Sequence, residues 1–171
     1  MTTEELAYPK LDKGFPAYPA LPDDILEFCL PRVSGQAFQQ AQIPWDRIEK
    51  HPLFPNSRAG TFGTTELEAG IDELGLETPI VVWRHHDEKG WPLLGEGVFD
   101  RFFVISGFRR YQSLKHGRGQ DVVGFVEKFP RVPVHIFEGD FIGAMVHNFS
   151  ENANRKNPTA IEFGNYVVAM R

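Results

Sequence analysis

Prolines near the amino terminus constrain the fold more than any other feature, because each fixes the backbone φ angle and removes a hydrogen-bond donor. Within the first 40 residues they are Pro9, Pro16, Pro19, Pro22 and Pro31. Only a short helix over Asp23–Leu30 is predicted here, begun by Pro22 and Asp23. Aromatic residues between the prolines indicate that the segment packs against a surface. We therefore predict an N-terminal arm over residues 1–40, which is also a candidate contact for a protein partner.

Short strands and helices alternate after the arm. Strands are predicted at 79–83, 102–105, 122–129 and 132–137, and an extended segment at 42–45. Helices are predicted at 65–74, at 108–116, and from a cap at Asp140 to about Ser150. A polar link over 151–157 and a helix started by Pro158 follow. Such short, unequal elements favour a compact α+β domain, with a short mixed sheet and flanking helices, over a doubly wound parallel sheet. This domain is predicted over residues 41–157, and 158–171 are predicted to begin a further helical module.

Charge is unevenly distributed around the net value of −5. Residues 1–100 hold 8 Lys/Arg and 17 Asp/Glu, whereas residues 101–171 hold 10 and 6. A general basic surface for nucleic acid is therefore not expected, and phosphate binding would use a local cluster in the second half. The single cysteine, Cys29, cannot form an internal disulfide, and no apolar run approaches the roughly 18 residues of a membrane span. We expect a reduced, cytoplasmic protein with neither a secretory signal nor a membrane anchor.

The sharpest local motif joins a strand, a glycine turn and a basic helix start. A buried strand is predicted to end at Ser106 and Gly107, and a helix to begin with Phe108, Arg109 and Arg110. The first amides of a helix and the positive end of its dipole attract anions, and arginine forks suit phosphate oxygens. The motif indicates a phosphate site, and the alternative is an ordinary exposed basic helix turn.

A second polar motif lies between two predicted helices. Glu151 and Asn152 offer oxygens suited to Mg²⁺, and Arg155 and Lys156 add positive charge. The alternative is a solvated loop. His85–Asp87 lacks a third metal ligand and is expected to be a solvated part of a long hairpin connection. Neither a P-loop nor a dinucleotide-binding glycine motif is present.

Together these motifs resemble the ParB/sulfiredoxin-type nucleotide-binding domain over about Gln42–Arg171. Four segments carry the resemblance: Pro55–Arg58, the helix–glycine–proline–strand block 69–82, Gly107–Arg110 for the family's G-E-R-R box, and 151–162 for its E-N-x-x-R box. The resemblance implies binding of CTP, with ATP as the alternative, together with Mg²⁺. In ParB proteins the nucleotide closes a dimer into a clamp on DNA. We therefore expect a homodimeric switch of DNA segregation or plasmid partition, with DNA bound only through a downstream module.

The resemblance also implies roles for individual residues. The implied nucleotide-binding set is Thr78, Pro79, Ser106, Gly107, Phe108, Arg109, Arg110, Glu151, Asn152 and Arg155. Thr78 and Pro79 would help to hold the base, and the arginines the phosphates. Glu151 and Asn152 would be the magnesium ligands, and Glu151 is the candidate catalytic residue.

One position departs from the family pattern. Phe108 stands where ParB proteins have glutamate and sulfiredoxins have the catalytic cysteine. Sulfiredoxin activity is therefore excluded, and weak or absent hydrolysis is expected. Two alternatives stay open: an ATP-using phosphotransferase or nuclease/ATPase, with Glu68 or Glu151 as the acid–base group, and a protein-interaction adaptor with a vestigial site.

Overall fold

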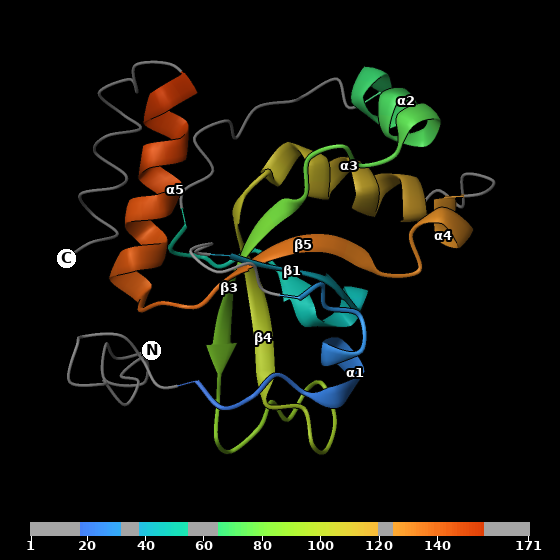
Figure 1. Cartoon of the computed structure of the whole chain (residues 1–171). Coiled ribbons are helices and arrows are strands. Elements are labelled where there is room, and N and C mark those ends of the chain that lie inside the picture. Colours follow the sequence, from blue (N-terminus) through green and yellow to red (C-terminus); the bar gives the residue numbers. More distant parts are fainter. Residues whose placement is uncertain (1–17, 32–37, 55–64, 120–124, 156–171) are drawn as a thin grey trace.

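A computed structural model describes residues 18–31, 38–54, 65–119 and 125–155 (Figure 1). Its elements are α1 (Asp23–Leu26), β1 (Phe38–Ile43), the 3-10 helix η2 (Trp45–Arg47), β2 (Ile48–Glu49), α2 (Thr65–Leu74), β3 (Ile80–His86), β4 (Asp100–Ser106), α3 (Phe108–Gly119), α4 (Phe125–Lys128), β5 (Val132–Phe137) and α5 (Phe141–Arg155). The predicted α+β class is confirmed. Among the described residues, none of the helices combines the length and apolarity that crossing a bilayer requires.

The five strands form one mixed sheet in the order β1-β5-β3-β4-β2. β5 runs parallel to β3 and β2 runs parallel to β4, whereas the β1–β5 and β3–β4 pairs are antiparallel. In this register, Val81 lies opposite Ser106 on one side and His135 on the other. The beginning of β3 and the end of β4 therefore meet at one end of the sheet, with His135 beside them.

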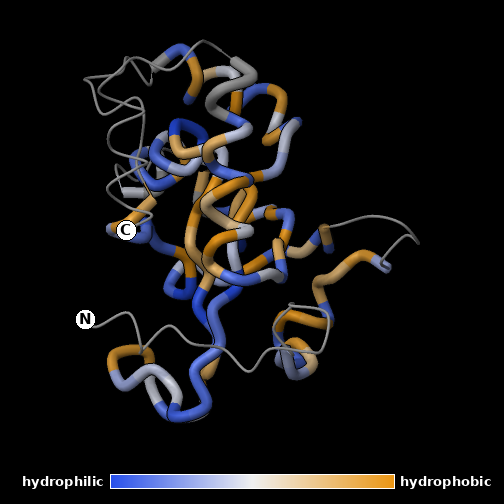
Figure 2. The backbone as a smooth tube through the Cα atoms, turned by 90° about the vertical axis from the view of Figure 1, so that its left-hand side faces the viewer, coloured by the Kyte–Doolittle hydropathy of each residue, from blue (hydrophilic) through white to orange (hydrophobic). Residues whose placement is uncertain are grey.

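One face of the sheet carries aromatic side chains beneath α5. Because side chains alternate along a strand, Trp83, Phe103 and Phe137 share this face. Phe141 at the start of α5 lies 5.7 Å from the Trp83 ring centroid, and Phe54 lies 5.8 Å from it. In Figure 2, where α5 faces the viewer, hydrophobic and hydrophilic bands alternate along the helix.

The other face holds the aliphatic part of the core. Its buried strand residues include the aliphatic Val82, Val104, Val134 and Ile136, together with Phe102. Ile25 of α1 and Phe125 of α4 are also buried, and both helices lie across the sheet from α5 (Figure 1). Among the described residues, helices therefore lie on both faces of the sheet.

The described part of the predicted arm packs against the domain. Leu21 and Ile25 are buried, the amide of Leu30 donates to the Gln40 carbonyl at 2.9 Å, and the amide of Gln42 donates to Phe28 at 3.2 Å. These bonds cover the outer edge of β1, which would otherwise expose unpaired backbone groups. The helix predicted over 23–30 ends at Leu26. Residues 1–17 and 32–37 of the predicted arm lie outside the described residues.

Two predicted elements are wrong where the structure describes them. The strand predicted over 122–129 is helical at Phe125–Lys128, because the Phe125 and Phe129 rings, four residues apart, both turn towards the core and lie 5.2 Å apart. The link predicted over 151–157 is helical through Arg155, since no helix-breaking residue precedes Pro158. Residues from 156 onward, including the predicted further module, lie outside the described residues.

Candidate functional site

The turn from β4 into α3 has the geometry predicted from the sequence. β4 ends at the buried Ser106, Gly107 has φ +84°, and α3 begins at Phe108. The first bond of the helix runs from the Tyr111 amide to the Gly107 carbonyl at 2.9 Å. The amides of the first turn therefore point out of the helix end, where the dipole favours an anion.

Arg110 holds this turn against the start of β3. Its Nη1 donates to the Thr78 carbonyl and, at 3.1 Å, to the Pro79 carbonyl. The guanidinium lies over Gly107 so closely that a Cβ there would be 3.0 Å from Nη2. The two segments predicted to hold base and phosphate are therefore joined directly. Arg110 also has a structural function, which differs from the purely phosphate-binding role implied by the resemblance.

The two residues before Arg110 have different environments. Phe108 is 8% exposed and belongs to the hydrophobic core, so its side chain is occupied in packing. Arg109 is half-buried in the first turn of α3. The position that carries glutamate in the family pattern therefore supplies neither an acid nor a base here.

Helix α5 approaches the same end of the sheet. Its start is capped by Asp140, whose Oδ1 accepts from the Gly143 amide at 2.7 Å, as the sequence predicted. Further along, the buried Asn148 donates through Nδ2 to the Ile105 carbonyl at 2.6 Å, two residues before Gly107. Glu151 follows Asn148 by about one helical turn. The Asn148 bond therefore ties α5 to the end of β4, and Glu151, Asn152 and Arg155 follow on the last turns of the same helix.

Two histidines beside these residues were missed by the sequence analysis. On β5, His135 has a pKa lowered by burial and by the nearby charge of Arg110. On α5, His147 has a pKa that burial lowers, while Glu151 acts in the opposite direction. Both rings contact Phe38, at centroid distances of 6.2 and 5.3 Å. The alternation of β5 and the four-residue spacing to Glu151 were the signals that could have placed them here.

Other candidate residues lie elsewhere. Glu68 on α2 accepts from His116 Nδ1 at 3.0 Å, and His116 is seven residues beyond Arg109, about 10 Å along α3. The structure therefore does not bring Glu68 to the Gly107 turn. The prediction of a solvated His85–His86 pair is wrong for His85, which is buried in β3, because that strand extends further than its apolar core indicated.

A metal ion would find few protein ligands in this part of the chain. Among the described residues, no group of three or more His, Cys, Asp or Glu side chains could hold a metal ion. Mg²⁺ often binds one or two side-chain oxygens and takes its remaining ligands from water and phosphates. The Glu151 carboxylate fits that mode of binding, in which a phosphate-bearing ligand brings the ion.

Comparisons with known proteins give limited results. No protein-family model matches the chain. No curated protein matches it either. Among solved structures, the C-terminally truncated chromosome-partitioning protein ParB from Caulobacter crescentus, complexed with CTP-gamma-S, matches with a TM-score of 0.46 and 18% identity. The match covers 68% of this chain and 54% of that one. At that identity and score, the similarity assigns neither a ligand nor an activity to this chain.

Proposed function

We propose that this domain binds a nucleoside triphosphate at the start of α3 and acts as a cytoplasmic switch that controls dimerisation or partner binding. CTP with Mg²⁺ is the ligand that the resemblance of the sequence to ParB proteins implies. The observation that carries the proposal is the junction of three segments: the Gly107 turn, the Thr78–Pro79 segment held to it by Arg110, and helix α5, which Asn148 ties to Ile105 at the end of β4.

Phosphate binding follows from the chemistry of this junction. Gly107 allows a tight backbone turn at φ +84°, and the first amides of α3 with the helix dipole favour negative charge. Arg109 adds a guanidinium whose planar fork suits phosphate oxygens. Arg110 supports the turn, so its contribution to phosphate binding is partly indirect.

We assign the contacts to the nucleotide base and to the metal ion to segments that neighbour the start of α3 in the chain fold. Thr78 and Pro79 would lie beside the base, and the Ser106–Gly107 backbone beside the phosphates. Glu151 and Asn152 would supply oxygens to Mg²⁺, with Arg155 adding positive charge. When bound, Mg²⁺ would neutralise part of the phosphate charge. DNA contact is assigned to a downstream module, because the first 100 residues are acidic.

The positions of the candidate acid–base residues favour a switch over an efficient enzyme. Phe108 packs into the core, and Glu68 pairs with His116 away from the junction. Glu151 is then the candidate acid or base, and we propose slow or absent hydrolysis. An ATP preference, with turnover that disappears in Glu151→Gln, would instead support the phosphotransferase or nuclease/ATPase alternative.

Calorimetric titration with CTP, ATP, GTP and UTP, each with Mg²⁺, tests the proposal. We expect selective CTP binding, and an Arg109→Ala variant with at least about tenfold weaker affinity because a charge-assisted hydrogen bond is lost. Arg110→Ala should lower both affinity and stability, because it also removes the hydrogen bonds to Thr78 and Pro79. Lys115→Ala, an exposed cation on the same helix, is the matched control. No binding of any nucleotide, or an Arg109→Ala affinity equal to wild type, would contradict the proposal.

A further inference from the structure

Two imidazole nitrogens near the junction are buried without a hydrogen bond. His135 Nε2 and His147 Nδ1 are out of reach of solvent, and neither has a partner in the part of the chain that the structure describes. Buried polar atoms are normally paired, because an unpaired one loses its hydration without replacement. Two such atoms in one small cluster therefore need an explanation.

Both nitrogens belong to a cluster that joins the elements of the proposed site. The His135 ring stacks on Phe38 at 6.2 Å with an interplanar angle of 20°, and the His147 ring meets the edge of Phe38 at 5.3 Å with an angle of 80°. His135 lies opposite Val81 at the beginning of β3, and His147 precedes Glu151 by one turn of α5. The cluster therefore lies between the Arg110 clasp and Glu151.

The chemistry of an imidazole indicates what the two rings can recognise. Burial lowers the pKa of His135, and the positive charge of Arg110 lowers it further. A neutral imidazole offers one donor and one acceptor, which suits hydroxyl, amino and carbonyl groups. Phosphate oxygens are better matched by Arg109 and the start of α3.

We propose that His135 and His147 are specificity residues that hydrogen-bond the uncharged sugar–base part of the nucleotide. This inference rests on the proposed function, and it assigns the recognition of the nucleoside to side chains of β5 and α5. The Phe38 ring contacts both imidazoles, at centroid distances of 6.2 and 5.3 Å, so ligand entry requires this ring to move.

Paired substitutions separate recognition from packing. Leucine at either position keeps bulk but removes the polar atom, whereas His135→Gln and His147→Asn return an amide near Nε2 and Nδ1, respectively. The probes are CTP and inorganic tripolyphosphate, each with Mg²⁺, measured by calorimetry on the full chain. His116→Leu, an exposed histidine on α3, is the control.

The wild type should bind CTP more tightly than tripolyphosphate. His135→Leu and His147→Leu should each weaken CTP binding by about tenfold, the loss of roughly one hydrogen bond, and leave tripolyphosphate binding within about twofold. Their melting temperatures should not fall, because leucine removes a buried unpaired polar atom. The amide variants should recover most of the CTP affinity.

Several results would overturn the inference, and they differ from failure of the proposed function. Leucine variants that bind CTP with wild-type affinity exclude nucleoside recognition by these rings. Variants that lose affinity for CTP and tripolyphosphate equally also exclude it. A wild type that binds tripolyphosphate as tightly as CTP also excludes it, while the phosphate site survives. A wild type that binds neither probe contradicts both proposals.

Discussion

Gly107 determines whether the chain can turn from β4 into α3 with Arg110 folded over the turn. Its φ of +84° is a backbone conformation that residues with a Cβ atom rarely adopt. An added Cβ would also lie 3.0 Å from Arg110 Nη2 and 3.3 Å from Cζ. A side chain at position 107 would therefore strain the backbone and also displace the Arg110 guanidinium.

We predict that Gly107→Ala lowers the free energy of unfolding by about 1–3 kcal/mol, the usual cost of a strained backbone conformation. Urea denaturation followed by circular dichroism measures this. Gly70→Ala is the matched control, because Gly70 lies inside α2 and a Cβ there meets nothing within 4 Å. That control should stabilise the domain by up to about 1 kcal/mol through helix propensity. Equal effects of the two substitutions would show that the Gly107 turn is not strained by a side chain.

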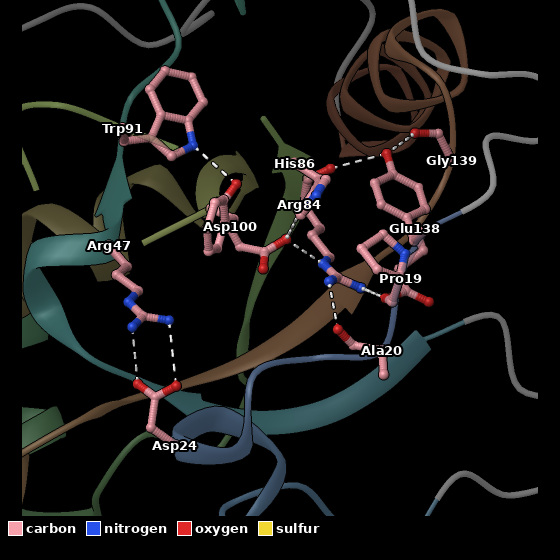
Figure 3. Close-up of polar contacts among 12 residues, drawn as sticks. Pro19, Ala20, Asp24, Arg47, Arg84, His86, Trp91, Asp100, Glu138 and Gly139 are labelled. Atoms are coloured by element: carbon pink, nitrogen blue, oxygen red, sulfur yellow. Dashed lines mark hydrogen bonds and ion pairs between the residues drawn. The ribbon is translucent and has the colours of Figure 1, made fainter. Parts of the chain in front are cut away.

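At the scale of elements, buried Arg84 ties the described part of the arm to the sheet (Figure 3). Its Nε donates to Asp100 Oδ1 at 2.8 Å, and its Nη1 to Glu138 Oε1 at 2.8 Å. The same guanidinium donates to the carbonyls of Pro19 at 2.9 Å and Ala20 at 3.2 Å. Arg84 thus joins β3 to β4, to the end of β5 and to the segment before α1.

Removing this guanidinium should release the arm and leave a buried carboxylate without its cation. We predict that Arg84→Met lowers the free energy of unfolding by about 3–5 kcal/mol, because Asp100 is 2% exposed and breaking a buried ion pair carries that penalty. Hydrogen exchange should also speed up at residues 18–30. Arg47→Met is the control, since its ion pair with Asp24 reaches the same arm at a more exposed position and should cost no more than about 1 kcal/mol. Similar losses in both variants would refute a special role for Arg84.

At the scale of the whole molecule, two buried histidines link stability to pH. His51 lies 4.8 Å from the Phe103 ring and 4.9 Å from Phe54, and His85 stacks on Trp83 at 5.4 Å. Burial lowers the pKa of both histidines to about 4. In the unfolded chain the same groups titrate near the ordinary histidine value of about 6.5.

Between these pKa values the unfolded state binds more protons than the folded one, so acid favours unfolding. The free energy of unfolding should be insensitive to these groups above about pH 6.5 and fall by about 1.4 kcal/mol per pH unit for each histidine as pH drops towards 4. Denaturation across that range should show a shallower slope in a His51→Gln/His85→Gln double variant. His116→Gln, on the exposed surface, is the control for replacing a histidine. An unchanged slope in the double variant would contradict the lowered pKa values.

Much of the fold could be predicted because its signals are local. The helix over 65–74 and the strand over 132–137 match the structure, and Asp140 caps α5 as its position suggested. Errors arose where one local pattern allowed two structures. Phe125 and Phe129 fit a strand by hydrophobicity, but their shared direction into the core made that segment helical.

The candidate site could be predicted only in part. The turn at Gly107 was evident from residue types, because glycine between a strand and a basic helix start has few structural uses. The clasp by Arg110 was not evident, since its acceptors are backbone carbonyls, which every residue has. His135 and His147 carried no motif, and their importance comes from lying half-buried beside Phe38, with Arg110 near His135 and Glu151 near His147.

The sequence by itself determined where backbone constraints act within a few residues: the short elements, the turns, the helix cap and the acidic first half. Only the tertiary structure decided which strands are neighbours and which side chains meet. Arg110 reaches an acceptor 31 residues away and Arg84 one 65 residues away. Contacts over such separations depend on how the sheet packs, and burial then sets which groups are charged, so no local pattern specifies them.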